Sequence, residues 1–269
     1  MPVRTGMSLL GAEFAAALHA EWTKLRTLAG TGWLLLGVVA VTLALSLAAV
    51  SEVTCRAAGC GQDPAKVSLT GVEFGQALVA VLAVLAISGE YGTGMIRLTF
   101  TALPRRLVVL AAKACTVSGL IAASGVLAVA GSLVLGRIFL PGNGFTATNG
   151  YSSIVDAATV RAGLGTVGYL VLIGLLALGL ATAVREAALA IGFVLALVYL
   201  FPLVAQLVTD QDWHRRLLQL GPMTAGLDVQ ATVNLAAQPL SPGAGLGVMA
   251  CWAAGGLLLG GLVLAARDA

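Results

Sequence analysis

Charged residues are scarce in this chain of 269 residues, at 10% of the total, while hydrophobic residues make up 59%. Adding the 34 glycines brings the apolar share to roughly 70%, against about 45–50% in an ordinary globular domain. So few charges cannot cover that much apolar surface in water. The composition excludes soluble enzymes, nucleic-acid-binding proteins and disordered tails, and it predicts a protein whose solvent is mostly lipid. The net charge of +3 is too small to indicate a polyanionic partner.

Histidine is nearly missing, since only His19 and His214 occur, and we expect them on opposite sides of a membrane. This excludes a metal centre built on histidine pairs. The sequence also has no G-x-x-x-x-G-K-[ST], so the chain does not bind nucleotide through a P-loop. Residues 163–168 match G-x-G-x-x-G, but they lie in an apolar run without the strand that a dinucleotide site requires. We expect no catalytic residue, metal or cofactor in this chain.

Six apolar stretches approach the length of about 20 residues that crosses a bilayer as a helix. They predict an all-α integral membrane protein, a single transmembrane domain over residues 1–269 with spans at 33–50, 69–88, 108–135, 162–184, 187–208 and 244–266. The third is the longest, which predicts tilting or protrusion into water. The first begins too late and runs too long for a cleaved signal peptide, which favours an uncleaved span.

The glycines inside the spans predict helix packing through small residues. The spacing G-x-x-x-G occurs at Gly71/Gly75, Gly243/Gly247 and Gly256/Gly260, and we expect helices to meet at each pair.

The distribution of basic residues predicts the orientation. Six spans place both termini on one side, and that side holds nine Lys and Arg residues against six on the other. Acidic residues run the other way, five against seven. The positive-inside rule therefore predicts cytoplasmic termini and a multi-pass protein.

Residues 8–28 have the pattern of an amphipathic helix. One face carries apolar residues at helical spacing: Leu10, Phe14, Leu18, Trp22 and Leu25. With Trp22, Lys24 and Arg26 just before the first span, we interpret the segment as an interfacial helix in contact with membrane lipid. The alternative is a simple cytoplasmic extension of the first span.

Two features mark the outer loops. Cys55 and Cys60 share one short loop, where they can form a local disulfide or remain two free thiols, while Cys115 and Cys251 lie in predicted spans. Residues 209–243 form a long loop, which we interpret as a re-entrant or interfacial element.

Glu73 and Gln76 are the polar pair that interrupts the second span. An acidic residue inside a span is a functional candidate, so the pair predicts a substrate path. Because Glu73 lies near the outer end, simple interfacial placement is the alternative.

The inner loop 89–106 is the longest polar interruption on the cytoplasmic side between two spans. Glu90 opens it, glycines at positions 92 and 94 bend it, and Met95–Ala102 can form a short amphipathic helix. We expect Glu90 to satisfy no buried partner, so that its replacement leaves the spans intact. The alternative is that this basic loop only fixes the topology.

Three stretches together resemble the membrane (permease) subunits of type-2 ATP-binding-cassette exporters in their actinobacterial form. They are residues 21–27 (EWTKLRT), residues 87–97 (ISGEYGTGMIR) followed by Pro104, Arg105, Arg106 and Lys113, and Leu240-Ser241-Pro242 leading into Trp252 and the terminal Arg267-Asp268-Ala269. The resemblance covers essentially the whole chain, and the middle stretch is its most specific part. The first outer loop and residues 137–160 match nothing in that family.

The resemblance implies roles for the loops. Segment 8–28 would be the interfacial connecting helix, segment 89–106 the coupling helix that docks on the ATPase, and segment 209–243 a re-entrant gate. The docking contacts implied are Glu90, Tyr91, Gly94, Arg97, Arg105 and Arg106. ATP and Mg would bind to separate ATPase subunits, present in two copies, and a second permease, identical or related, would complete the pathway in a bacterial cell membrane.

The function implied is export of an amphipathic substrate such as a drug, a peptide or a lipid-like molecule, with ATP hydrolysis on the partner subunit. A non-transporting sensor or scaffold derived from the exporter fold is the alternative, and a membrane enzyme would need a catalytic cluster that the sequence does not offer. Co-purification of an ATPase distinguishes these hypotheses. The identity of the substrate is not readable from the sequence.

Overall fold

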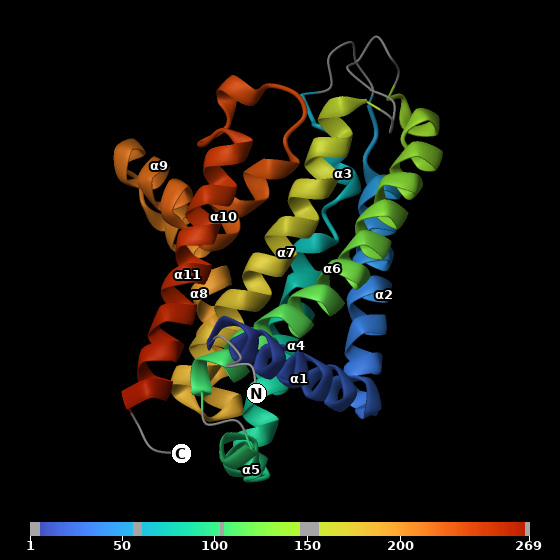
Figure 1. The fold of residues 1–269 in the computed structure, drawn as a ribbon. Helices are drawn as coiled ribbons and strands as arrows, with labels where there is room; N and C mark the ends of the chain where they lie inside the picture. Colours follow the sequence, from blue (N-terminus) through green and yellow to red (C-terminus); the bar gives the residue numbers. More distant parts are fainter. Residues whose placement is uncertain (1–5, 56–60, 103–104, 146–155, 267–269) are drawn as a thin grey trace.

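The computed structural model describes residues 6–55, 61–102, 105–145 and 156–266, which are almost entirely helical and include no strand. Six of the helices are long and apolar enough to cross a membrane (Figure 1): α2 (Ala29–Glu52), α4 (Val72–Gly92), α6 (Arg106–Phe139), α7 (Ala157–Val184), α8 (Ala187–Leu207) and α11 (Pro242–Ala266). A helix satisfies its own backbone hydrogen bonds, which lipid cannot do. The six predicted spans are confirmed as helices, and their ends shift by at most five residues.

The bundle is built around α7. It contacts α4, α6, α8 and α11, and 61% of its most apolar stretch is buried, against 17% for α8. Side chains such as Leu36 on α2, Leu200 on α8 and Leu262 on α11 are exposed. These exposed apolar faces are the ones that lipid would cover.

Glycine allows α7 and α11 to approach each other closely. A Cβ at Gly260 would lie 2.4 Å from the carbonyl oxygen of Gly179, and a Cβ at Gly179 would lie 2.3 Å from the carbonyl carbon of Gly256. No larger residue fits there without separating the helices. The predicted contact at Gly256/Gly260 is confirmed.

Of the other two glycine pairs, one contacts a neighbouring helix and one does not. Gly71 and Gly75 meet α2, where Cβ atoms would lie 2.0 Å from the Thr42 carbonyl oxygen and 2.2 Å from the Thr42 hydroxyl. The prediction for Gly243 and Gly247 is wrong, because a Cβ at either position meets nothing within 4 Å. The intervening Gly245 makes the contact instead, since it lies on another face of α11.

The third span is the longest helix. With 34 residues, α6 extends about 51 Å, well beyond the roughly 30 Å hydrocarbon core of a bilayer.

Two helices lie outside the bundle at the end where both termini are found (Figure 1). The first, α1 (Gly6–Thr27), crosses the bundle and packs mainly on α6. The second is the short α5 (Met95–Ala102), which begins and ends where the sequence predicts a helix. On α1, Trp22 is 46% exposed and Arg26 is exposed, while Glu21 and Leu25 face the bundle and are buried.

The opposite end of the bundle carries short helices: α3 (Pro64–Ser68), η1 (Pro141–Asn143), α9 (Gln211–Leu220), α10 (Pro222–Leu227), η3 (Asp228–Gln230) and η4 (Leu235–Ala237). The segment from α10 to η3 folds back along α7, where a Cβ at Gly226 would lie 2.3 Å from the Tyr169 ring. Tyr169 is twelve residues past the first residue of α7, which is about 18 Å along the helix. Segment 209–243 is therefore structured, and its part from α10 to η3 packs into the bundle, whereas α9 has no buried residue.

The cysteine pairing stays a prediction. The Cys55 backbone N–H donates to the Asn143 carbonyl at 2.8 Å, and Cys60 lies outside the described residues. Cys115 and Cys251 are free and exposed on α6 and α11.

Candidate functional site

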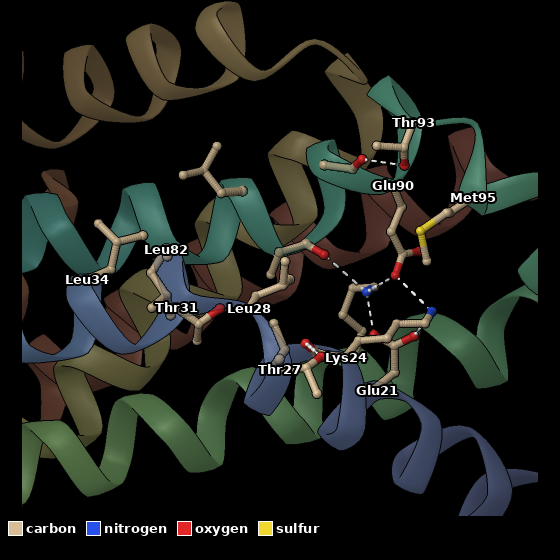
Figure 2. Close-up of a pocket in the computed structure, with 16 residues that line it drawn as sticks. Glu21, Lys24, Thr27, Leu28, Thr31, Leu34, Leu82, Glu90, Thr93 and Met95 are labelled. Carbon is tan, nitrogen blue, oxygen red and sulfur yellow. Dashed lines mark hydrogen bonds and ion pairs between the residues drawn. The ribbon is translucent and has the colours of Figure 1, made fainter.

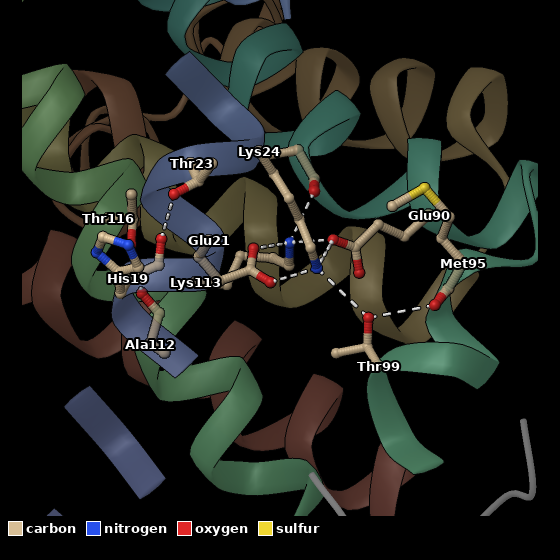
Figure 3. A network of polar contacts seen from close by, with 11 residues as sticks. His19, Glu21, Thr23, Lys24, Glu90, Met95, Thr99, Ala112, Lys113 and Thr116 are labelled. Atoms are coloured by element: carbon tan, nitrogen blue, oxygen red, sulfur yellow. Dashed lines mark hydrogen bonds and ion pairs between the residues drawn. The ribbon is translucent and has the colours of Figure 1, made fainter. Parts of the chain in front are cut away.

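Four charged side chains from three helices meet at the end of the bundle that holds α1 and α5 (Figure 3): Glu21 and Lys24 on α1, Glu90 on α4 and Lys113 on α6. Two positive and two negative groups balance, so the cluster has no net charge. We refer to these four residues as the charge cluster.

Lys113 is the centre of the charge cluster. Its side chain is 1% exposed. The ammonium donates to Glu21 Oε2, to Glu90 Oε1 at 2.9 Å and to the Ala86 carbonyl at 3.1 Å. All three of its donors are therefore used, which is what a lysine in a span requires.

Lys24 lies on the more exposed side of the charge cluster. Its ammonium donates to Glu21 Oε1 at 2.8 Å, to Glu90 Oε1 at 2.9 Å and to the Thr99 hydroxyl of α5 at 3.3 Å. Partial burial opposes the charge on Lys24, but the hydrogen bonds and charges of Glu21 and Glu90 outweigh it and raise the pKa of Lys24. The lysine is thus held in its charged form.

The expectation that Glu90 satisfies no buried partner is wrong. Glu90 lies in the last turn of α4 rather than in a loop, it is 7% exposed, and it accepts from Lys24 and Lys113. Removing one member of a buried charge pair leaves its partner uncompensated and costs about 3–5 kcal/mol. Replacing Glu90 will therefore disturb the fold as well as any docking contact.

Glu21 and Lys113 were not predicted as site residues from the sequence. They are separated by 92 positions, so no local pattern connects them. The usable signal was the position of Lys113 inside a predicted span, because a lysine there needs an acidic partner.

The short helix α5 is next to the charge cluster and contacts it through Thr99. Gly94, at φ +71°, makes the turn from α4 into α5, a conformation that glycine adopts without strain. Ile96 is 4% exposed and anchors α5, whereas Leu98 is 71% exposed. The face of α5 that carries Leu98 is thus exposed.

The remaining predicted docking residues lie around α5 without forming one cluster. Arg105 pairs with Glu13 of α1 at 3.1 Å on the surface, and Arg106 donates to the Leu264 carbonyl of α11 at 2.9 Å. The Arg185 guanidinium lies 5.5 Å from the centre of the Tyr91 ring. The side chain of Arg97 lies outside the described part of the structure.

The side chains of Glu73 and Gln76 lie in different surroundings, although both residues are on α4. Glu73 lines a cavity of about 580 Å³ together with Lys66 and Asp228, at the end of the bundle opposite α1 and α5. Gln76 is fully buried, where its amide carbonyl accepts from the Tyr169 hydroxyl. Only Glu73 therefore faces this cavity.

A second polar network, which the sequence reading did not find, fastens the outer segments together. Asp63 accepts from the Thr232 hydroxyl at 2.7 Å and from the Val233 backbone at 2.9 Å. Asp228, 5% exposed, lies 3.7 Å from Lys66. Burial raises the pKa of the Asp228 carboxyl, although the nearby Lys66 ammonium opposes the shift.

Among the described residues, no three His, Cys, Asp or Glu side chains are grouped so that they could hold a metal ion. No family model matches the sequence, and comparison with curated proteins finds no similar one. The arrangement that stands out is thus a buried, charge-balanced junction between α1, α4 and α6, with α5 attached to it on the side of the termini.

Proposed function

We propose that this chain is the membrane subunit of a type-2 ATP-binding-cassette exporter and that α5 is the helix on which a soluble ATPase acts. The observation that carries the proposal is the attachment of α5 to the charge cluster through Thr99 and Lys24, at 3.3 Å. The sequence resemblance at residues 21–27 and 87–113 falls on the same elements and supports the same assignment.

The charge cluster offers a physical route for coupling. A push on α5 reaches α1 through Lys24 and α4 through the turn at Gly94. Because the charges are buried, separating them is costly, so α1, α4 and α6 move together at this end. Rigid helices packed through glycine then carry the displacement toward the far side of the bundle.

The proposal includes a set of partners. Two ATPase subunits, each with ATP and Mg, act on two permeases, identical or related, in a bacterial cell membrane with both termini in the cytoplasm. Export of an amphipathic molecule is the reaction of the whole assembly, and ATP hydrolysis belongs to the partner.

The test is capture of the tagged chain from membranes of its own source cells, followed by identification of bound chains and an ATPase assay. We expect an ATP-binding-cassette ATPase in a one-to-one ratio with the permease. Leu98→Asp, on the exposed side of α5, should reduce the captured ATPase at least tenfold, because a charge replaces an apolar contact.

His19→Asp is the matched control, since His19 is exposed on α1 and also gains a negative charge. It should capture the ATPase as the wild type does. Correctly inserted wild-type protein that captures no ATPase would contradict the proposal and favour a sensor or scaffold.

A further inference from the structure

An apolar groove of about 460 Å³ lies between the start of α2 and the inner half of α4, and it reaches the charge cluster (Figure 2). Leucines line it, one of them between α1 and α2 and the others on α1, α2 and α4: Leu28, Leu25, Leu34, Leu82 and Leu85. Both its volume and its mostly apolar lining, with a few polar groups at one end, are typical of sites for small molecules.

One polar atom at this end of the groove is unsatisfied. Oε2 of Glu90 is buried and accepts no hydrogen bond from the described residues, although Oε1 of the same carboxylate accepts from both Lys24 and Lys113. A buried acceptor without a donor destabilises the folded protein. A ligand that donates a hydrogen bond to it removes this penalty and binds more tightly.

Met95 is a flexible residue at this end of the groove. Its side chain, 42% exposed, also lines the groove and lies next to Glu90 in both close-ups (Figures 2 and 3). Methionine has three flexible bonds and adapts readily to a neighbour. A donor entering along the leucines therefore reaches Oε2 when the Met95 side chain rotates.

The charge balance restricts the ligand's head. Lys24 and Lys113 already match Glu21 and Glu90, so a charged head of either sign would bring an unbalanced charge into a buried site. A neutral hydroxyl donates a hydrogen bond without that cost.

We propose that this groove binds a neutral amphiphile whose hydroxyl group donates to Oε2 of Glu90 and whose hydrocarbon chain lies along the leucines. The site does not depend on the proposed function, because it is formed by this chain alone. The occupant is either a neutral membrane lipid such as a diacylglycerol or a hydroxyl-bearing molecule that arrives from solution.

The experiment titrates 1-dodecanol into the full chain in lauryldimethylamine oxide near pH 8, where this detergent has no hydrogen-bond donor, and counts bound ligand by native mass spectrometry. The comparison ligands have the same chain length: 1-methoxydodecane lacks the hydroxyl donor and dodecylamine carries a charge. We expect 1-dodecanol to bind about tenfold more tightly than 1-methoxydodecane, roughly the contribution of one hydrogen bond to a charged acceptor. Dodecylamine should also bind more weakly than 1-dodecanol.

Gly89→Leu tests the location without touching the charge cluster. Gly89 lines the groove, and a Cβ there meets nothing within 4 Å, so a leucine side chain at this position can extend into the groove. Gly119→Leu on α6 is the matched control, because that glycine is equally open and lies outside the groove. Gly89→Leu should weaken binding of 1-dodecanol at least tenfold, and Gly119→Leu should leave it unchanged.

Lipid extraction from the purified protein separates the two sources. About one diacylglycerol per chain, lost in Gly89→Leu, assigns the site to a membrane lipid, whereas no diacylglycerol together with binding of 1-dodecanol assigns it to a ligand from solution. Equal binding of 1-dodecanol and 1-methoxydodecane, or full binding to Gly89→Leu, overturns the proposal.

Discussion

Lys113 carries an ammonium group on a helix that is otherwise an ordinary apolar span. Two carboxylates and one backbone carbonyl accept its three hydrogen bonds. The lysine therefore stabilises the fold only as part of the charge cluster, and removing it would leave Glu21 and Glu90 close together with Lys24 as their remaining cation.

Lys113→Met should lower the free energy of unfolding by about 3–5 kcal/mol, because it leaves buried carboxylates without their main partner. Lys24→Met should cost less, about 1 kcal/mol, because the Lys24 side chain is 25% exposed and water can replace part of its interactions. Denaturant unfolding of both variants in mixed micelles measures the difference. Equal losses would mean that burial of Lys113 does not set the strength of the charge cluster.

The stability of the folded protein should depend on pH through Asp228. Burial raises its pKa, so the folded state binds the proton more tightly than the unfolded state does. Its contribution to stability is complete below the unfolded pKa and is lost as pH rises through the folded pKa. The melting temperature of the wild type relative to Asp228→Asn should therefore fall as the pH rises from about 4, the ordinary pKa of an aspartate. A constant difference over a series of thermal scans would contradict this.

The contacts between individual side chains were the hardest feature to predict from the sequence. The predicted set included Glu90 and Lys24. Glu21 lies three residues before Lys24 on α1, but Glu90 and Lys113 come from α4 and α6, so only the fold brings them to the α1 pair. Glu90 was expected at a water-facing surface because it lies where the apolar run ends. The last turn of α4 instead points it at Lys113.

At the scale of helices, the contact between α7 and α11 depends on having no side chain at Gly260. Gly260→Ala should lower the free energy of unfolding by about 1–3 kcal/mol, because the new Cβ must push the helices apart. Gly255→Ala on the same helix is the control, since a Cβ there meets nothing within 4 Å. It should be neutral or stabilising by up to about 1 kcal/mol, from the better helix propensity of alanine.

Denaturant unfolding also measures this pair of variants. If Gly260→Ala were as stable as Gly255→Ala, the close approach of α7 and α11 would not limit stability.

Helices were predictable where a single run of residues determines them. Each span follows from an apolar stretch, and α5 follows from the glycines before it and the proline after it. The glycine contacts were predictable only in part, because spacing does not say which face of a helix meets a neighbour. Gly243 and Gly247 have the same spacing as Gly256 and Gly260, yet they face away from the other helices.

The whole molecule has two chemically different ends. The end with the termini holds α1, α5 and the charge cluster, and the other end holds Asp63, Lys66 and the folded segment 209–243. Charge counting predicted that the first end faces the cytoplasm.

Cysteine labelling tests this orientation. In a variant without native cysteines, a cysteine at Gln62 should react with a membrane-impermeant maleimide added to intact cells, because Gln62 is exposed before α4. A cysteine at Thr101, exposed after α4, should react only after the membrane is opened. Labelling of both positions in intact cells would contradict a single spanning orientation.

The chain order of the charge cluster bears on how the protein is made. Glu21 and Glu90 both precede Lys113, so the ribosome has finished α1 and α4 before α6 emerges. A lone lysine costs about 2.5–3.5 kcal/mol at the centre of a span during insertion, and less toward the end of the helix, where Lys113 lies. Because both acidic partners are synthesised first, α6 can enter the membrane with its lysine already paired. The order of synthesis then lowers the free-energy cost of burying the charge of Lys113.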